Sequence, residues 1–363
     1  TGLNLYINGD VDRIRRTPPQ VAGELLRANR EKRIPHIHAS TSPSIYFYDV
    51  NLQLPIFKDK SAGRKLRRAL ALAIDRPRLI REVSRAEQSP AYSMVPSLIR
   101  GYHAEARFGA GTLKGDIDEA KRLVGEFESA GNARPQLRIL YNTLEAHKAI
   151  AAFIQDQWKT HLGIEVKLEN QEWQVYLDSR RKGEFDLARA GWIPDYSDPN
   201  TYLELYTSDD LSSDRDPKRL EAKINYNQQN HSRYNNPHYN RLVIEYSART
   251  LDYLADTSKR AALLADVPSW PDFAEVIGSK KRSNGKTSWE QFREELPAYD
   301  SAESSDARIE VAQRLRMLLL EMAEQMLMWD LPVIPIYHYT TSEIWPPELE
   351  GIGINEREVH PAK

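Results

Sequence analysis

Residues 185–199 read FDLARAGWIPDYSDP, a short and mostly apolar run followed by a turn that is rich in proline and aspartate. The apolar part, from Phe185 to Trp192, lies between Gly183 and Pro194. This length and these flanking residues predict a buried strand of a sheet. We therefore take this strand as the centre of the fold and work outward from it.

The segments before this strand alternate between two periodicities. Apolar runs that predict strands occur at residues 137–141 and 164–168, and residues 145–162 and 173–181 show the 3.6-residue pattern of helices. Glycines follow both helical segments, as is common at helix ends. Strand, helix, strand, helix, strand in succession is typical of an α/β layer with parallel pairing.

Other periodic segments lie on both sides of this unit. A basic cluster of Arg64, Lys65, Arg67 and Arg68 is interpreted as a solvated helix face, and Asp116 as a helix cap. No role is assigned to residues 257–305. Strands are expected at residues 3–7, 45–50 and 333–339, and helices at residues 64–83, 116–129, 202–206, 240–254 and 306–329.

Two charged residues near the end of the central strand need explanation. Arg189 shares an alternating face with Phe185 and Leu187, where a guanidinium must find an anion or water. Asp195 stands between Pro194 and Tyr196, where a carboxylate can meet a cation. Together they suggest a ligand with both charges. The residues by themselves favour a structural interpretation, with Arg189 in a buried ion pair and Asp195 capping a helix that starts near Pro199.

Composition excludes several classes of function. With 363 residues the chain has room for two domains or one large discontinuous domain, and its 40% hydrophobic and 28% charged residues are ordinary for a globular protein. The net charge of -2 offers no electrostatic basis for binding nucleic acid. Because cysteine is absent, disulfides, thiol catalysis and cysteine-bound metals are excluded.

Motifs of catalysis are also missing from the sequence. There is no Gly-x-Ser-x-Gly elbow and no His-Glu-x-x-His zinc motif, and the nine histidines form no obvious metal cluster. We expect no metal, no cofactor and no enzymatic activity. A carboxylate-dependent hydrolase that uses Asp195 and Asp198 remains the enzymatic alternative.

Several sequence blocks, taken in order and spacing, resemble the extracytoplasmic peptide-binding proteins of ABC importers, the family of oligopeptide, dipeptide and nickel solute-binding proteins. The run from Leu140 to Pro199 is particularly similar to the oligopeptide-binding subgroup. The blocks are YINGDVD (6–12), RRALALAIDR (67–76), DEAKRL (118–123), LYNT (140–143) with His147, LGIEV (162–166), NQEW (170–173), LDSR (177–180), residues 185–199, NPHYN (236–240) and LPVIPIY (331–337).

The resemblance implies a periplasmic-binding-protein-like clamshell, in which a second lobe is inserted between separated segments of the first. Residues 1–49 would be a remnant of lobe one, residues 50–335 the second, C-terminal lobe, and residues 336–363 a return segment to lobe one. One lobe presents half of a groove, so we expect the isolated chain to bind peptides weakly or not at all.

The resemblance also implies site residues. The position of Asp195 is the one that receives the α-ammonium of the peptide, and the backbone from Gly191 to Ile193 would lie beside the peptide as an added strand. Ile193 stands where a small residue is usual. The positions of Arg189, Arg180 and His147 meet the peptide's C-terminal carboxylate or bound water. Trp192 and Trp173 are equally compatible with side-chain pockets and with core packing.

The expected partners follow from the same resemblance. They are an oligopeptide ligand and the membrane permease of an ABC importer, and the protein is expected to be a monomer. Its expected location is periplasmic or otherwise extracytoplasmic, with a membrane anchor through a preceding segment left open. Nickel, haem and oligosaccharide are the alternative ligands, and Asp195 argues for an amine.

Overall fold

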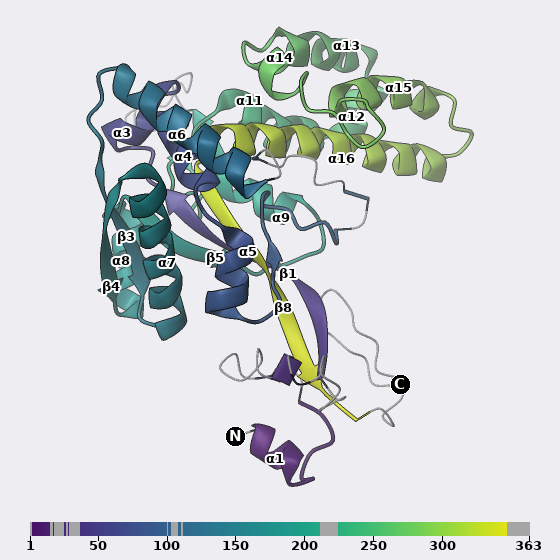
Figure 1. Ribbon diagram of the computed structural model, residues 1–363. Coiled ribbons are helices and arrows are strands. Elements are labelled where there is room, and N and C mark those ends of the chain that lie inside the picture. Colours follow the sequence, from purple (N-terminus) through teal and green to yellow (C-terminus); the bar gives the residue numbers. More distant parts are fainter. Residues whose placement is uncertain are drawn as a thin grey trace.

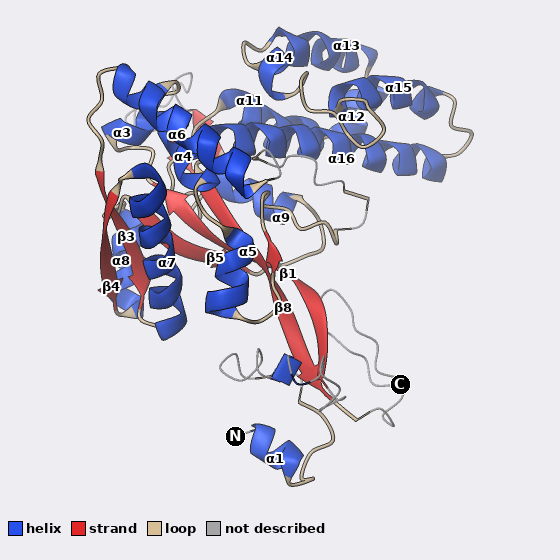
Figure 2. Cartoon of the chain, in the orientation of Figure 1, coloured by secondary structure: helices blue, strands red, loops and turns tan. Residues whose placement is uncertain are grey.

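The computed structural model describes residues 2–14, 17, 25, 26, 28, 37–99, 101, 102, 108, 109, 112–210 and 224–346. Its centre is a six-stranded mixed sheet with the order β2-β8-β1-β5-β3-β4 (Figures 1 and 2). The strands are β1 (Ile37–Val50), β2 (Ser89–Pro90), β3 (Gln136–Asn142), β4 (Glu165–Gln171), β5 (Leu187–Trp192) and β8 (Val333–Ile344).

The predicted parallel unit is confirmed in β3, β4 and β5, which run parallel to one another through helices α7 (Glu145–Leu162) and α8 (Trp173–Lys182). Both helices end as predicted, at Gly163 and Gly183, whose φ angles of 65° and 75° suit glycine. Alternation along β3 places Ile139 in the main core with α7 and Leu140 in a second cluster with Tyr176 of α8. The two helices therefore cover opposite faces of this part of the sheet.

Beyond β5 the pairing becomes antiparallel. Strand β5 pairs with β1, and β1 pairs with β8 from Ile37 opposite Ile344 to Asp49 opposite Val333. Both strands are longer than predicted, and Figure 1 shows them running out of the main body toward α1 (Gly2–Ile7). Residues 3–7 form this helix, so the strand predicted there is wrong.

The predicted lobe bounds fall inside this two-stranded ribbon. The division after residue 49 lies in β1, and the division after residue 335 lies in β8. Most of the predicted return segment, residues 347–363, is outside the described residues. The assignment of residues 1–49, 50–335 and 336–363 to lobes therefore stays a prediction.

Several helices precede the parallel unit, and they correct two details. Residues 64–83 form α4 (Ala62–Leu72), α5 (Arg76–Leu79) and a π-helical turn (Ile80–Ser84) instead of one helix, because Asp75 accepts a hydrogen bond from the Arg78 amide and starts a new helix. Helix α6 (Leu113–Ser129) begins before Asp116, which is therefore not its cap.

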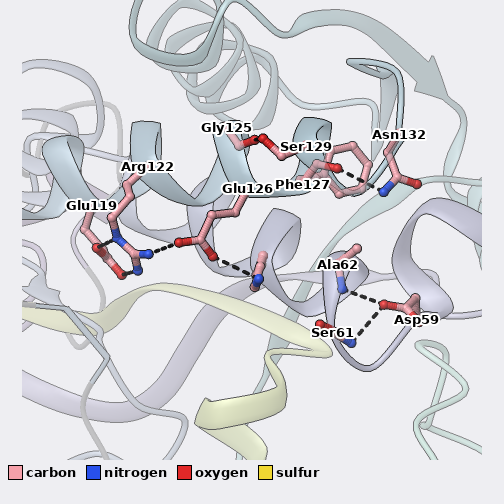
Figure 3. A network of polar contacts seen from close by, with 11 residues as sticks. Asp59, Ser61, Ala62, Glu119, Arg122, Gly125, Glu126, Phe127, Ser129 and Asn132 are labelled. Carbon is pink, nitrogen blue, oxygen red and sulfur yellow. Dashed lines mark hydrogen bonds and ion pairs between the residues drawn. The ribbon is translucent and has the colours of Figure 1, made fainter.

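The basic cluster at the start of α4 is only partly solvated. Arg67 is buried and donates from Nε to the Asp330 carbonyl at 2.7 Å, so its interpretation as a solvated residue is wrong. Lys65 lies 2.9 Å from Glu126 of α6, and Figure 3 shows Glu126 also bonded to Arg122. In the same view Asp59 accepts from two amides at the start of α4. The ion pair of Lys65 thus joins α4 to α6, and Asp59 caps the start of α4.

A helical layer follows β5, and α16 (Ser305–Asp330) is its long central element. Figure 1 shows the other helices of residues 237–300 gathered along α16, and α12, α14 and α15 contact it directly. Residues 257–305, which had no assigned role, therefore cover α16. The elements are α9 (Asn200–Leu203), η2 (Glu204–Tyr206), β6 (Ser208–Asp210), β7 (Ile224–Tyr226), α11 (Pro237–Asn240), η4 (Arg241–Ser247), α12 (Thr250–Ala255), α13 (Thr257–Asp266), η5 (Val267–Ser269), α14 (Phe273–Val276) and α15 (Ser288–Asp300).

Helix α16 is buried along most of its second half, including Leu319, Met322 and Leu327. Its apolar residues face protein on several sides, as expected of a helix inside a large core. Among the described residues no helix has the length and apolarity needed to cross a membrane.

Candidate functional site

Strand β5 has one fully paired edge and one partly open edge. It pairs with β1 from Leu187 to Trp192, but with β3 only at Leu187 and Ala188. On that second edge, residues 189–192 have no strand partner within the described part of the chain. An open strand edge offers backbone donors and acceptors to an extended ligand.

Arg189 lies where this open edge begins and is not in the predicted ion pair. Its Nη1 donates to Asn142 Oδ1 at 3.3 Å and its Nη2 to the Tyr339 hydroxyl at 3.5 Å. Its Nε is buried without a partner, and no carboxylate of the described residues is within ion-pair distance of it. The structure therefore leaves this positive charge without a matching negative charge.

Tyrosines from two strands surround Arg189, and the sequence analysis did not identify them. The Tyr46 ring of β1 lies 4.9 Å from the guanidinium, and it stacks on Tyr337 of β8 at 4.9 Å between ring centroids. Tyr337 in turn contacts Tyr339 edge-on at 5.2 Å. Burial raises the pKa values of Tyr46 and Tyr337, so both remain neutral hydrogen-bonding groups. The alternating Tyr46/Tyr48 and Tyr337/Tyr339 pairs were the available sequence signal.

His147 joins the same cluster from the first turn of α7. It is buried, and its Nδ1 lies 3.3 Å from the Tyr46 hydroxyl. Burial, and secondly the positive charge of Arg189, lower the pKa of His147 to about 3. His147 is therefore a neutral imidazole at physiological pH, and the structure brings it and Arg189 together as candidate site residues.

This low pKa predicts acid sensitivity. The folded-state pKa lies below the unfolded value, so the unfolded chain binds the proton first and stability is lost as the pH falls below about 6.5. From pH 7 to pH 5 the contribution of His147 to the free energy of unfolding should fall by about 2 kcal/mol. Urea unfolding of the wild type and of His147→Gln at both pH values measures it. Parallel pH profiles for the two proteins would contradict the expectation.

Arg180 is held in a buried ion pair. Its Nε and Nη2 donate to Asp49 Oδ2 at 3.1 and 2.6 Å, and Asp49 is fully buried. The hydroxyls of Tyr206 and Ser232 also donate to Asp49, each at 3.3 Å. This network satisfies hydrogen-bond donors of Arg180 inside the protein. Arg180 is therefore not part of the proposed contact surface.

Asp195 and Ile193 lie on the surface just beyond β5. Ile193 is 73% exposed, and Asp195 is exposed and makes no hydrogen bond or ion pair with the described residues. The cap near Pro199 is Asp198, which accepts from the Asn200 amide at 2.9 Å, so the interpretation of Asp195 as that cap is wrong. Asp195 is thus a carboxylate available to a cation.

Asp198 has a structural partner. Arg316 of α16 donates to both of its oxygens, at 2.6 and 3.0 Å. The bidentate pair fixes the turn after β5 to the helical layer. Asp195 and Asp198 are therefore not two free carboxylates, which removes the main argument for hydrolysis.

The remaining predicted residues flank the open edge. Trp192 is half-buried and donates from Nε1 to Thr201 at 3.2 Å, whereas Trp173 is 45% exposed and stacks on Tyr176. Gly191 has little room for a side chain, because a Cβ there would lie 3.3 Å from the Ile45 carbonyl. Among the described residues no group of three or more histidines, aspartates or glutamates could hold a metal ion.

The fold and the open site are those of a binding protein. Residues 1–214 match the family described as bacterial extracellular solute-binding proteins, family 5 (Middle), and the chain belongs to this family. Membership confirms the predicted resemblance and the expectation of a solute-binding protein instead of an enzyme. It also agrees with the expected extracytoplasmic location.

Individual relatives extend this result. The chain is 31% identical to the periplasmic murein peptide-binding protein MppA of Escherichia coli. The match covers 69% of this chain and 43% of MppA. The chain is 31% identical to the periplasmic oligopeptide-binding protein OppA of Salmonella typhimurium over 73% and 44% of the two lengths. The chain thus spans less than half the length of either relative.

A solved structure confirms the predicted fold class. The unliganded open form of the periplasmic murein tripeptide binding protein MppA superimposes with a TM-score of 0.64 at 26% sequence identity. The match covers 99% of this chain and 53% of that one. The α/β fold of the periplasmic-binding-protein type is therefore shown along the chain.

Proposed function

We propose that this chain supplies the larger part of one ligand-binding lobe of a protein that captures oligopeptides for an ABC importer, with Asp195 receiving the peptide amino terminus. The observation that carries the proposal is the exposed carboxylate of Asp195, without a partner in the described residues, beside the open edge of β5. Relatives named for binding oligopeptides and murein peptide support the ligand class.

The two charged ends of the site fit a peptide. Arg189 is the uncompensated cation at one end of the open edge, and Asp195 is the available anion beyond the other. They are six positions apart in the chain, which is at most about 20 Å in extended conformation. A short extended peptide carries an ammonium and a carboxylate at such a separation, and its backbone can bond to residues 190–192 without regard to its side chains. The Arg189 carbonyl already accepts a hydrogen bond from the Tyr176 hydroxyl.

The alternative ligands fit this site less well. Nickel would need several nitrogen or oxygen ligands converging on one point, and the described residues offer no such cluster. Neither haem nor an oligosaccharide supplies the ammonium that an unpaired carboxylate favours. An amine-bearing peptide uses both charged residues of the site.

The proposed partners are the ligand, a second lobe and a permease. A lobe that closes over the open edge would exclude water and strengthen the ion pair at Asp195. The permease of an ABC importer would receive the captured peptide at the extracytoplasmic face of the membrane, from a monomeric binding protein.

The test compares peptides that differ only at their amino terminus. We expect tri- to pentapeptides with a free amine to bind more than tenfold tighter than their N-acetylated forms, because acetylation removes a charge-assisted hydrogen bond. Calorimetry on the 363-residue chain and on the protein purified from its host measures the difference. Native mass spectrometry of the latter would identify a ligand carried through purification. Equal binding of the free and acetylated peptides would contradict the proposal.

A further inference from the structure

A small pocket with both charged and apolar walls lies between α4, the segment after α14 and the end of α16. The cation-bearing residues Arg68 and Lys280 face it, with Gln325 and Trp329 from α16; Phe108 and Met328 contribute apolar walls. Trp329 lies roughly 20 Å along the axis of α16 from Arg316, which holds Asp198. The pocket is therefore separate from the proposed peptide site.

The two cations of the pocket lack anionic partners. Neither Arg68 nor Lys280 makes a hydrogen bond or an ion pair with any residue that the structure describes, and the Arg68 guanidinium lies 5.6 Å from the centre of the Trp329 ring. Burial lowers the pKa of Arg68. Burial, and then the charge of Arg68, lower the pKa of Lys280. The pocket thus holds two partly desolvated cations that repel each other.

Neutral polar groups in the same pocket are also unsatisfied. The indole Nε1 of Trp329 is a buried donor without an acceptor, and Gln325 Oε1 is a buried acceptor without a donor among the described residues. Buried polar groups are normally hydrogen-bonded, and each exception requires a physical explanation. A ligand that accepts hydrogen bonds would satisfy Trp329, and one of the three Lys280 protons would remain for Gln325.

Of the carboxylates near Arg68, Glu119 is held by another arginine. The negative groups that act most on Arg68 are Glu119 and Asp116. Glu119 accepts two hydrogen bonds from Arg122, at 2.6 and 2.7 Å, as Figure 3 shows. Asp330 lies 4.0 Å from Arg64, the other arginine that stacks on Trp329. These pairs leave Arg68 and Lys280 as the positive charge facing the pocket.

We propose that this pocket binds one small oxyanion, of the size of inorganic phosphate, through Arg68, Lys280 and the indole N–H of Trp329. The pocket is partly open and encloses room for about one water molecule, so the ion would place some of its oxygens among these groups and leave the others toward solvent, and a nucleotide would not be enclosed. Such an ion would link α4 to the helical layer and raise the melting temperature by binding the folded state alone. The inference is independent of peptide binding.

The test follows the indole N–H signal of Trp329 by NMR, assigned with Trp329→Phe. Sodium phosphate replaces sodium chloride at constant ionic strength. We expect a saturable shift of this signal, with sulfate acting similarly, and a higher melting temperature in phosphate. Arg68→Met and Lys280→Met should each weaken binding by about tenfold or more, because each removes a charge-assisted hydrogen bond. The exposed neighbour Lys281→Met has the same change in net charge and should leave affinity unchanged.

Several outcomes would overturn the site. They are a shift that does not saturate, an equal shift when only chloride is varied, and unchanged affinity in Arg68→Met. If Arg68→Met does not fold, Arg68→Lys replaces it and should retain weaker binding, because lysine keeps the charge and loses the guanidinium fork. A signal that responds to phosphatidylglycerol vesicles and not to inorganic phosphate would assign the pocket to a lipid headgroup and reject a free ion.

Discussion

Replacing Asp195 with asparagine is expected to lower the affinity for peptides with a free amino terminus by about 100-fold, because the ammonium loses its charged acceptor in a site that ligand and protein together desolvate. Asparagine keeps the size of the side chain, so the change in affinity measures the effect of the lost negative charge. The affinity for N-acetylated peptides should change little. Calorimetry with matched free and acetylated peptides gives both values.

A remote carboxylate provides the control for this substitution. Asp252 of α12 is exposed, and Asp252→Asn makes the same change in net charge. It should bind both peptide forms like the wild type. If Asp195→Asn also retained full affinity for free-amine peptides, the amino terminus would be bound elsewhere and Asp195 would have no such role.

Replacing Asp49 with asparagine should lower the free energy of unfolding by about 3–5 kcal/mol, because it leaves the Arg180 guanidinium nearly buried without its counter-charge. Both side chains are inaccessible enough that water cannot replace the lost partner. Denaturant unfolding monitored by circular dichroism measures the loss. The result also separates the structural role of Arg180 from its predicted ligand role.

An exposed ion pair serves as the comparison. Arg134 and Glu128 lie 2.8 Å apart with both side chains substantially exposed. Glu128→Gln should therefore change the free energy of unfolding by less than about 1 kcal/mol. A loss in Asp49→Asn no larger than in this control would show that the buried pair does not stabilise the fold. Arg180→Met with normal stability and a selective loss of peptide binding would return Arg180 to the site.

The parallel unit was predictable because its signals are local. The helix over residues 145–162 and its end at Gly163 follow from periodicity and from a glycine in the left-handed conformation, both encoded within about twenty residues of chain. Residues 3–7 show the limit of such signals. A run of five residues that mixes apolar and polar side chains is too short for its periodicity to distinguish a strand from a helix. Contacts with other segments of the chain decide which of the two forms.

The candidate site was predictable in part. Arg189 and Asp195 were identified from their unusual positions in and after a strand, and the resemblance added His147. The tyrosines around Arg189 were missed, because Tyr46 and Tyr339 come from strands far away in sequence. Arg180 was placed in the site, although Asp49, 131 residues before it, binds it in the structure.

The sequence by itself determined the α/β class, the order of the central elements, the family resemblance and the unusual positions of Arg189 and Asp195. Only the tertiary structure decided that Asp195 is available, that Asp198 is held by Arg316, and that Arg189 lies among tyrosines with no carboxylate partner in the part of the chain that the structure describes. The physical reason is the range of the interactions. Periodicity, caps and turns act between neighbours in the chain, whereas the environment of a charge depends on which distant side chains the packed core brings within a few ångströms of it.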